Sequence, residues 1–248
     1  MLAPTAALLE TAMHRMVIDK RALVASIPVF SDLESDELDG LLDIAMSRSV
    51  GADEVLLRRG DEGNEVFAIL EGRMKATYEG SDGRELVFSI MEPGEVIGEI
   101  ALFDGEPRSL DIIALEASRL LVIDRGDFLR FLDGHPKVSI KLLAALARRV
   151  RSVTALVEDA FFMNVSSRLA KRLVTLARLY GEETEGGMRI GLKLSQRELG
   201  ELVGASRETV NKQLRAWVDE GLLAWGEDSQ ITIVAPEGLE GLALLASL

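Results

Sequence analysis

The chain has 248 residues, of which 28 are Lys or Arg and 41 are Asp or Glu, so its formal net charge is −13 at pH 7. This balance excludes a protein that binds nucleic acid with its whole surface. With 48% hydrophobic residues the chain can bury the core of one large or two medium domains, which excludes disorder as its main state. The absence of cysteine excludes disulfides, thiolate zinc sites, iron–sulfur clusters and cysteine nucleophiles.

The hydropathy pattern predicts neither a membrane span nor a secretory signal. The longest stretch without Asp, Glu, Lys or Arg is Ala22–Ser31, which is much shorter than the ~18 residues of a spanning helix. The segment Met1–Glu10 has no basic region before its apolar residues. We therefore expect a soluble, cytoplasmic protein with no membrane partner.

Residues 13–47 alternate apolar and charged positions at helical spacing. Pro28 interrupts this pattern, and Ser31 or Asp32 is predicted to cap a helix over Leu33–Met46. The role of residues 1–19 is left open.

From Gly51 to Asp124 the pattern changes to short β-rich runs separated by turn clusters such as Gly60–Gly63 and Gly80–Gly83. Nine of the 22 glycines fall between Gly51 and Gly105, as repeated tight turns require. The runs are Val66–Leu70, Arg73–Tyr78, Leu86–Met91, Leu110–Leu115 and Leu120–Ile123. This pattern predicts an antiparallel, jelly-roll-like β-roll.

A long helix is predicted over Val138–Phe162, with an apolar stripe spaced 3, 4, 3, 4 and 3 residues apart. The stripe consists of Leu143, Leu146, Val150, Val153, Val157 and Ala160. This heptad seam favours a homodimer through the helix over packing on its own domain. Residues 160–167 are predicted to form a hinge, with Ser166 or Ser167 capping a helix over Arg168–Tyr180.

Two short helices are predicted after residue 192. Ser195 and Glu198 form a capping box, so one helix begins at Gln196, and it ends at Gly204. Ser206 caps the second helix, which runs over Arg207–Glu220 and ends at Gly221. Two helices this close, with small Gly200 where they cross, predict a helix-turn-helix.

The second of these helices has an apolar stripe of Val210, Leu214 and Trp217. Its other face carries Arg207, Glu208, Asn211 and Lys212, and these residue types can hydrogen-bond base edges in double-stranded DNA. We count Ser195, Gln196 and Ser206, at the two helix N-termini, with this surface. The segment 189–215 has six basic and three acidic residues, so it is locally positive within an acidic chain.

Strand signals at Leu222–Trp225 and Ile231–Val234, with a turn between them, predict a β-hairpin after the second helix. The C-terminal part is therefore expected to be a winged helix-turn-helix.

The segment Gly98–Ser109 predicts an anion site within the β-roll. Gly98 permits close backbone approach, and Glu99, Ile100 and Ala101 begin a single helical turn whose free N–H groups can face an anion. Arg108, which follows Pro107, supplies a positive charge, and Ser109 supplies a further donor. A β-roll turn with a surface ion pair is the alternative reading.

Over residues 20–235 the chain resembles the cyclic-AMP receptor / fumarate-nitrate regulator family of bacterial transcription factors. The segment Leu202–Lys212 is similar to the family's recognition helix, and Gly98–Ser109 is similar to its phosphate-binding cassette. The resemblance implies an α+β fold in three parts. These are a β-roll cyclic-nucleotide domain with N-terminal helices over 1–136, a dimerisation helix over 137–162 and a winged helix-turn-helix over 163–248.

The resemblance further implies a homodimer that binds a palindromic operator with half-sites similar to TGTGA, read by Arg207, Glu208 and Lys212. Because the cyclic-AMP receptor subgroup typically has Arg where this chain has Lys212, the preferred operator is expected to shift. Cyclic AMP is the implied effector, with Glu99 on the ribose, and Arg108 with Ser109 on the phosphate.

The resemblance also places Arg149 against Glu99, and Thr154 near the base, either within one chain or across the dimer. Leu110 and Asp111 depart from the small or neutral residues usual after the cassette's Arg-Ser. A second carboxylate near a phosphate is unfavourable, so another cyclic nucleotide or dinucleotide, or no small ligand, stays an alternative.

An enzyme is the competing class, for example a cupin-like metal oxygenase built on the β-roll. Such a site needs several histidines inside the barrel, and the only two, His14 and His135, lie outside the predicted strands. The same two are the main candidates for a haem ligand, so we expect no enzyme, metal, haem or iron–sulfur cluster. A surface for RNA polymerase would be the loop Gly181–Met188, whose acidic, glycine-rich composition fits a connector equally well.

Overall fold

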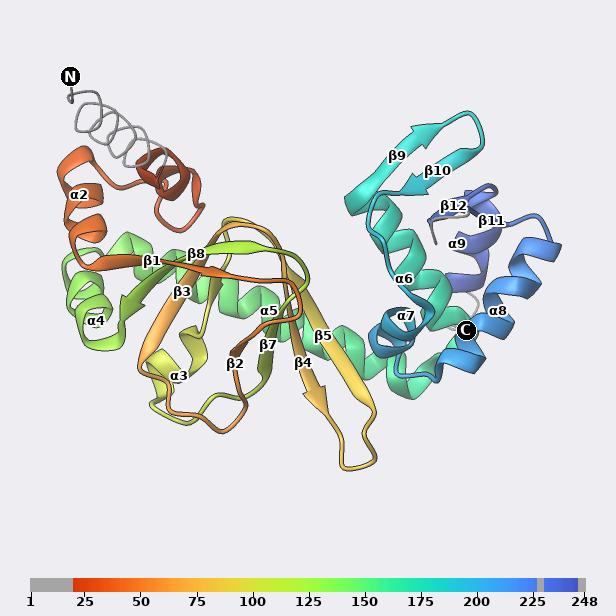
Figure 1. The fold of residues 1–248 in the computed structure, drawn as a ribbon, viewed down its shortest axis with the longest axis horizontal. Helices are drawn as coiled ribbons and strands as arrows, with labels where there is room; N and C mark the ends of the chain where they lie inside the picture. Colours follow the sequence, from red (N-terminus) through yellow and green to blue (C-terminus); the bar gives the residue numbers. More distant parts are fainter. Residues whose placement is uncertain (1–19, 227–229, 245–248) are drawn as a thin grey trace, which may run out of the picture. The chain divides into compact units, whose positions relative to one another are not determined.

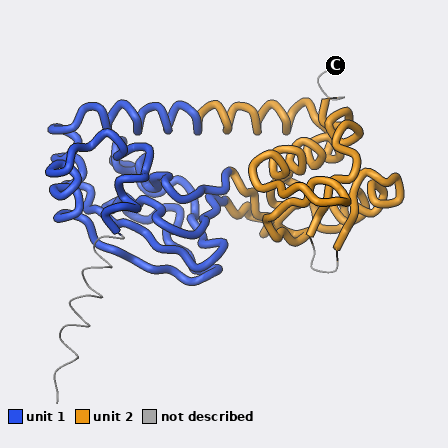
Figure 2. Tube along the Cα trace, turned by 90° about the horizontal axis from the view of Figure 1, so that it is seen from above, with its two compact units in different colours: residues 1–77, 89–149 blue, residues 78–88, 150–248 orange. Residues whose placement is uncertain are grey.

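The computed structural model describes residues 20–226 and 230–244. The chain divides into two compact units, residues 1–77 with 89–149 and residues 78–88 with 150–248 (Figure 2). In the described part of the chain, no helix has the length and apolar character needed to cross a bilayer.

Residues 20–26 are helical and precede the labelled elements shown in Figure 1. In chain order these are α2 (Ser35–Asp43), β1 (Ala45–Val50), β2 (Val55–Leu57), β3 (Glu65–Glu71), β4 (Met74–Glu79), β5 (Glu85–Met91), β6 (Val96–Ile97), α3 (Glu99–Asp104), β7 (Asp111–Ala114), β8 (Ser118–Asp124), α4 (Arg125–Gly134), α5 (Pro136–Phe162), α6 (Val165–Tyr180), β9 (Gly181–Thr184), β10 (Gly187–Ile190), α7 (Gln196–Val203), α8 (Arg207–Asp219), β11 (Leu223–Trp225), β12 (Ile231–Ile233) and α9 (Pro236–Leu244).

The first unit is built on two four-stranded sheets with the strand orders β1-β8-β3-β6 and β2-β7-β4-β5. The pairs β1–β8, β3–β8, β3–β6, β2–β7 and β4–β7 are antiparallel. Most of these partners are distant in sequence; Val66 on β3, for example, pairs with Ile123 on β8. The predicted antiparallel β-roll is confirmed.

Both faces of the sheet that contains β3 and β8 are covered. On β3, Phe67 and Ile69 belong to the core shared with strands of the second sheet, whereas Val66 and Ala68 belong to a core shared with helices. Successive side chains of a strand point to opposite faces. This two-sided burial explains why β3 is a continuous apolar run with no alternation.

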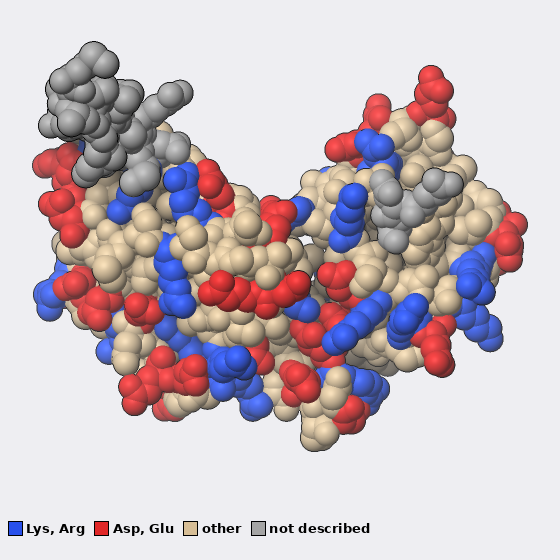
Figure 3. Space-filling view, viewed as in Figure 1, with Lys and Arg blue, Asp and Glu red and all other residues tan. Residues whose placement is uncertain are grey.

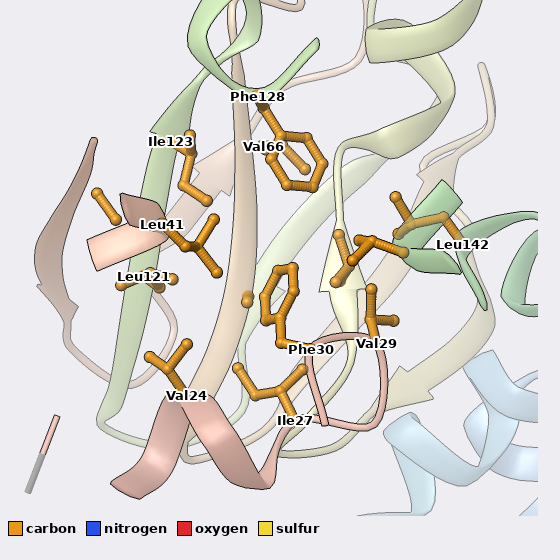
Figure 4. Packing of buried hydrophobic residues seen from close by; sticks show 14 of the residues in the cluster. Val24, Ile27, Val29, Phe30, Leu41, Val66, Leu121, Ile123, Phe128 and Leu142 are labelled. Carbon is orange, nitrogen blue, oxygen red and sulfur yellow. The ribbon is translucent and has the colours of Figure 1, made fainter. Parts of the chain in front are cut away.

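The helix-side core joins residues from the two ends of the first unit's chain (Figure 4). Phe30 meets the ring of Phe128 edge-on, with ring centroids 6.3 Å apart. Leu142, on the first part of α5, is fully buried in the same cluster. The N-terminal helices, α4 and the start of α5 therefore form one layer on this sheet.

The second unit contains α6 to α9 and a four-stranded sheet with the order β11-β12-β10-β9. The stripe Val210, Leu214 and Trp217 of α8 is completely or almost completely buried, as its spacing predicts. The β11–β12 pair is the predicted wing, so a winged helix-turn-helix is present.

The predicted helix over Leu33–Met46 is wrong at both ends. α2 begins only at Ser35, because Glu34 and Glu37 form a reciprocal capping box around its first turn. The Ser31 hydroxyl instead donates to the Pro28 carbonyl, 3.0 Å away. Residues from Ala45 onward form β1, because pairing with β8 outweighs their helical spacing. Residues 13–19 of that pattern lie outside the described part.

The predicted hinge over 160–167 is also too long. α5 continues to Phe162, and α6 begins at Val165, so only Met163 and Asn164 separate the two helices. Asn164, and neither of the two serines, caps α6, because its side chain accepts from the Ser167 amide at 2.9 Å.

Several elements have no counterpart in the prediction. The acidic segment predicted as a loop near residue 185 is the hairpin β9–β10. The strands β1, β2 and β6, and the helices α4 and α9, were also not predicted from the sequence.

Candidate functional site

The cassette lies where β6 turns into α3. Gly98 has φ of 83°, a left-handed conformation that favours glycine. A Cβ at this position would lie 2.6 Å from Nη1 of Arg108 and 3.2 Å from the Glu65 carbonyl oxygen. Glycine is therefore required for the arginine to pack against the start of α3.

Arg108 is only 5% exposed. Its Nη1 donates to the Gly98 carbonyl at 3.0 Å, and its Nη2 donates to the Glu65 carbonyl at 2.6 Å. Its Nε is buried and has no hydrogen-bond partner among the described residues. Desolvation lowers the pKa of Arg108, and the charges of Glu65, Glu99 and Asp61 oppose this shift. The site thus holds a buried cation whose Nε donates no hydrogen bond to the described residues.

Glu99, the first residue of α3, is 3% exposed and forms an ion pair with Arg149 of α5. Arg149 also donates to the Val96 carbonyl at 2.7 Å and lies 3.6 Å from a carboxylate oxygen of Glu95. The Glu99–Arg149 contact expected from the family resemblance is therefore present. It neutralises and orients a carboxylate that would otherwise be costly to bury.

The other cassette residues differ in exposure. Ile100 and Ser109 are exposed, whereas Ala101 is buried. Thr154 is exposed on α5, and its hydroxyl donates to the Val150 carbonyl of its own helix at 3.0 Å.

Asp111 has a structural partner that sequence reasoning missed. Its Oδ1 accepts a 2.8 Å hydrogen bond from the Arg59 amide. Leu110 packs against the core between the two sheets. Because Ile112 and Ala114 also face that core, strand alternation turns the Asp111 side chain to the opposite face of the strand. This alternation is visible in the sequence and could have predicted the orientation of Asp111.

The helix-turn-helix forms as its capping signals predict. Ser195 accepts from the Glu198 amide while the Glu198 carboxylate accepts from the Ser195 amide, so the capping box at α7 is confirmed. A Cβ on Gly200 would lie 2.5 Å from the Ala205 carbonyl oxygen, so only glycine allows the turn to close on α7. Ser206 caps α8 by accepting from the Thr209 amide.

The expected base-reading side chains lie on one accessible side of α8. Arg207, Glu208 and Lys212 are exposed and Asn211 is half-buried. In the space-filling view, basic side chains lie along α8 with acidic ones among them (Figure 3). A shallow depression of about 390 Å³ is lined by Glu208, Asn211, Lys212, Arg215, Ala216 and Asp219. Sequence reasoning missed Arg215, although it lies one turn beyond Asn211 and is exposed.

At the start of α7, Gln196 is half-buried, and its Oε1 has no hydrogen-bond partner among the described residues. The next residue, Arg197, forms an i,i+4 ion pair with the buried Glu201, with an N–O distance of 2.8 Å. The hydrogen bond that Arg197 donates to Glu201 raises the pKa of Arg197. Sequence reasoning missed this pair, although its i,i+4 spacing is a visible signal.

The apolar seam of α5 is largely accessible in the single chain. Leu143, Val150, Val153 and Val157 are between 43% and 66% exposed. Leu146 is half-buried and Ala160 is exposed. Such a stripe on a surface helix is typical of a face that packs against another helix.

The comparisons with known proteins agree with this architecture. A cyclic nucleotide-binding domain model matches residues 47–135, and a Crp-like helix-turn-helix domain model matches residues 167–242. A CRP-like cAMP-activated global transcriptional regulator of Mycobacterium tuberculosis is 31% identical over 80% of this chain and 89% of its own length. The cyclic AMP receptor protein of Thermus thermophilus is 30% identical over the same shares.

Among solved structures, the c-di-GMP responsive global regulator CLP of Xanthomonas campestris superposes with a TM-score of 0.74 and 22% identity. The match covers 81% of this chain and 99% of that one. A CooA variant from Carboxydothermus hydrogenoformans gives a TM-score of 0.74 at 20% identity, over 88% and 95% of the two chains. These two likenesses concern the fold.

The chain is thus a CRP-like transcription regulator with a cyclic nucleotide-binding domain and a DNA-binding helix-turn-helix. It belongs to the cyclic-AMP receptor / fumarate-nitrate regulator family.

Proposed function

We propose that this regulator binds a pseudopalindromic DNA operator as a homodimer, and that a cyclic nucleotide bound in the cassette controls its operator affinity. The three parts of the chain would be an effector domain over 1–136, a dimerisation helix over 137–162 and a DNA-binding domain over 163–248. The observation that carries the proposal is α8, whose apolar stripe is buried while Arg207, Glu208 and Lys212 are exposed.

The α8 side chains support sequence-specific DNA binding because each can hydrogen-bond a base edge. Arg207 and Lys212 can donate to guanine O6 and N7, and Glu208 can accept from cytosine N4. Ser195 caps α7, which begins at Gln196, and Ser206 caps α8. Each cap binds one amide of the first turn, and the other free amides of that turn can face phosphates. The residues that read bases therefore lie next to groups that can fix the register on the duplex.

The exposed seam of α5 supports the homodimer. Its six positions leave at least four apolar side chains accessible in the single chain, and a second copy of the same helix would cover them. A two-fold dimer would present two recognition helices to half-sites about one helical turn apart, ~34 Å.

The buried cation Arg108 supports an anionic effector. Its free Nε, with the exposed hydroxyl of Ser109, can donate to a phosphate, and Glu99 can accept from a sugar hydroxyl while Arg149 balances its charge. Gly98, Ile100 and Ala101 complete the cassette, and Thr154 is the proposed base contact.

Cyclic AMP is the first effector to test, because the names of the M. tuberculosis and T. thermophilus relatives connect those proteins with it. Another cyclic nucleotide or dinucleotide is the alternative, and control without a small ligand is a further one.

RNA polymerase is a further proposed partner, through the exposed, acidic strand β9 of the β9–β10 hairpin. A regulator that binds chromosomal operators in a bacterium acts in the cytoplasm, which is where we place it.

The test is a fluorescence titration of an operator duplex and a scrambled duplex, each with no effector, cyclic AMP, cyclic GMP or cyclic di-GMP, at two salt concentrations. Specific binding requires a preference for the operator that survives the higher salt, because phosphate contacts weaken with salt on both duplexes. Equal affinity for both duplexes in every condition would overturn the DNA-binding proposal. Operator preference that no nucleotide alters would overturn effector control alone.

A further inference from the structure

The tip of the β4–β5 hairpin, residues 78–88, belongs to the second compact unit. It groups with residues 150–248, whereas the remainder of both strands groups with the first unit (Figure 2). Backbone hydrogen bonds close this hairpin tip, because the Gly80 amide donates to the Arg84 carbonyl at 2.8 Å and the Gly83 amide donates to the Gly80 carbonyl at 3.0 Å. The hairpin tip is therefore a formed turn in the same unit as the helix-turn-helix.

The hairpin tip lies against the turn between α7 and α8. An ideal Cβ on Gly204 would lie 3.9 Å from Cδ1 of Leu86, which is ordinary van der Waals contact. A groove of about 560 Å³ runs between the hairpin tip and this turn, and its walls include Glu85 of the hairpin tip and Ser206 and Arg207 at the start of α8. The hairpin tip therefore borders the residues with which the recognition helix begins.

The hairpin tip carries a net negative charge. Its charged side chains are Glu79, Asp82, Arg84 and Glu85. Arg84 forms an ion pair with Asp82, with an N–O distance of 2.6 Å, so the one positive charge is neutralised by a neighbour in the same turn. Glu85 and Asp82 both line the groove beside α8. The hairpin tip thus brings carboxylates to the start of the recognition helix.

These carboxylates also lie near the start of α7. The hydrogen bond that Arg197 donates to Glu201 raises the pKa of Arg197, and the charges of Glu85 and Glu79 act in the same direction. Arg197 is the second residue of α7. A helix start attracts negative charge because its first amides have no partner within the helix, and the phosphates of a duplex would use the same attraction. Carboxylates of the hairpin tip and phosphates of DNA therefore compete for one place.

We propose that the hairpin tip is an autoinhibitory cover of the DNA-reading surface, and that it must leave the start of α8 before a duplex can bind. The inference rests on the proposed function in that α8 binds the operator, but it does not require a nucleotide effector. When only a fraction of the molecules has the cover withdrawn, the apparent affinity for DNA falls by that fraction. Weakening the cover should therefore tighten operator binding without any effector.

The first experiment neutralises the cover. Full-length Glu79→Gln/Glu85→Gln is compared with the control Glu158→Gln/Glu220→Gln, which removes the same charge from exposed side chains of the second unit. The two control side chains form no hydrogen bond or ion pair with the described residues. Operator affinity and association rate are measured by fluorescence without nucleotide, and Tm is measured to confirm folding.

We expect the hairpin variant to bind the operator roughly 2- to 30-fold more tightly than the wild type, the effect of removing two exposed repulsive charges. The gain should appear mainly in the association rate, because binding that requires a conformational change associates slowly. The control should stay close to the wild-type values.

The second experiment locks the cover in place, and it does not depend on neutralising any charge. Because the chain has no cysteine, Ser81→Cys in the exposed turn and Ala205→Cys in the groove can be joined selectively by a cleavable bis-maleimide. The crosslinked protein should bind the operator at least about tenfold more weakly, and cleavage of the linker should restore binding. Each single-cysteine variant treated with the same reagent is the matched control and should keep its affinity.

Either of two results would overturn this proposal and leave the proposed function intact. The first is an operator affinity of Glu79→Gln/Glu85→Gln that equals that of the control variant. The second is a crosslinked protein that still binds the operator normally, or a cysteine pair that the reagent does not join, since the hairpin tip would then not cover the turn. A wild type that binds operator and scrambled duplexes equally would instead overturn DNA recognition by α8, and this proposal with it.

Discussion

Replacing Arg108 with Gln tests the cassette most directly. Gln removes the positive charge and the Nε that has no hydrogen-bond partner among the described residues, which we propose to bind the anion. A hydrogen bond between a charged donor and its acceptor contributes ~1.5–3 kcal/mol, which corresponds to a loss of affinity of roughly 10- to 150-fold. The same change removes the donors to the Gly98 and Glu65 carbonyls, so we also expect a lower Tm.

The assay is isothermal titration of full-length protein with cyclic AMP, cyclic GMP and cyclic di-GMP, with sedimentation as a check on assembly. Arg58→Gln is the matched control, because Arg58 is exposed on the neighbouring loop and its side chain forms no hydrogen bond or ion pair with the described residues. We expect Arg108→Gln to lose affinity for the nucleotide and Arg58→Gln to keep it, while the assembly state of Arg108→Gln stays that of the wild type. Unchanged affinity in a folded Arg108→Gln protein would refute the assignment of Arg108 as the anion-binding residue.

Four further predictions concern other parts of the molecule. The double substitution Val153→Glu and Val157→Glu should raise the dissociation constant of the dimer by more than about 100-fold in sedimentation, because an unpaired buried carboxylate costs at least ~3 kcal/mol. A wild type that is already monomeric at micromolar concentration would contradict dimerisation through the α5 seam. Arg207→Ala should cost ~1–3 kcal/mol on the operator and relax discrimination at one base pair, whereas equal weakening on operator and scrambled duplexes would indicate a phosphate contact instead. Asp111→Asn should leave effector affinity unchanged, since its acceptor oxygen serves a backbone amide, and tighter binding would mean that the carboxylate faces the phosphate. The hydrogen bond from Arg73 lowers the pKa of Glu116, so the stabilisation by this pair is present above the unfolded pKa of about 4.3 and is lost as pH falls through the lower folded value. The Tm difference between wild type and Glu116→Gln should therefore vanish in acid, and a difference that stays constant with pH would contradict this prediction.

The sequence alone was sufficient to predict the helix-turn-helix. Its signals are local, since each capping side chain binds an amide three residues away and the apolar stripe repeats within one helix. Gly200 could also be placed, because its close partner Ala205 lies only five residues on. Interactions between residues this close in sequence leave few alternative conformations, so the helix boundaries in the structure agree with the predicted ones almost residue by residue.

The β-roll was predictable as a class, but its strands were not all found. The strand signal of Ala45–Val50 is weak, and these residues become β1 only because they pair with the distant strand β8, as Ala45 does with Ile123. β3 was found from its apolar run Val66–Leu70, although it lacks the alternation of a half-buried strand because both of its faces are covered.

Only the tertiary structure decided which distant groups the side chains of the candidate site contact. Arg108 reaches Glu65 across 43 positions, and Asp111 accepts from the Arg59 amide across 52. Neither of these separations follows a helical or strand period, so no local pattern in the sequence encodes them. They exist because packing of the cores brings distant backbone groups together, and a buried backbone group then requires a partner.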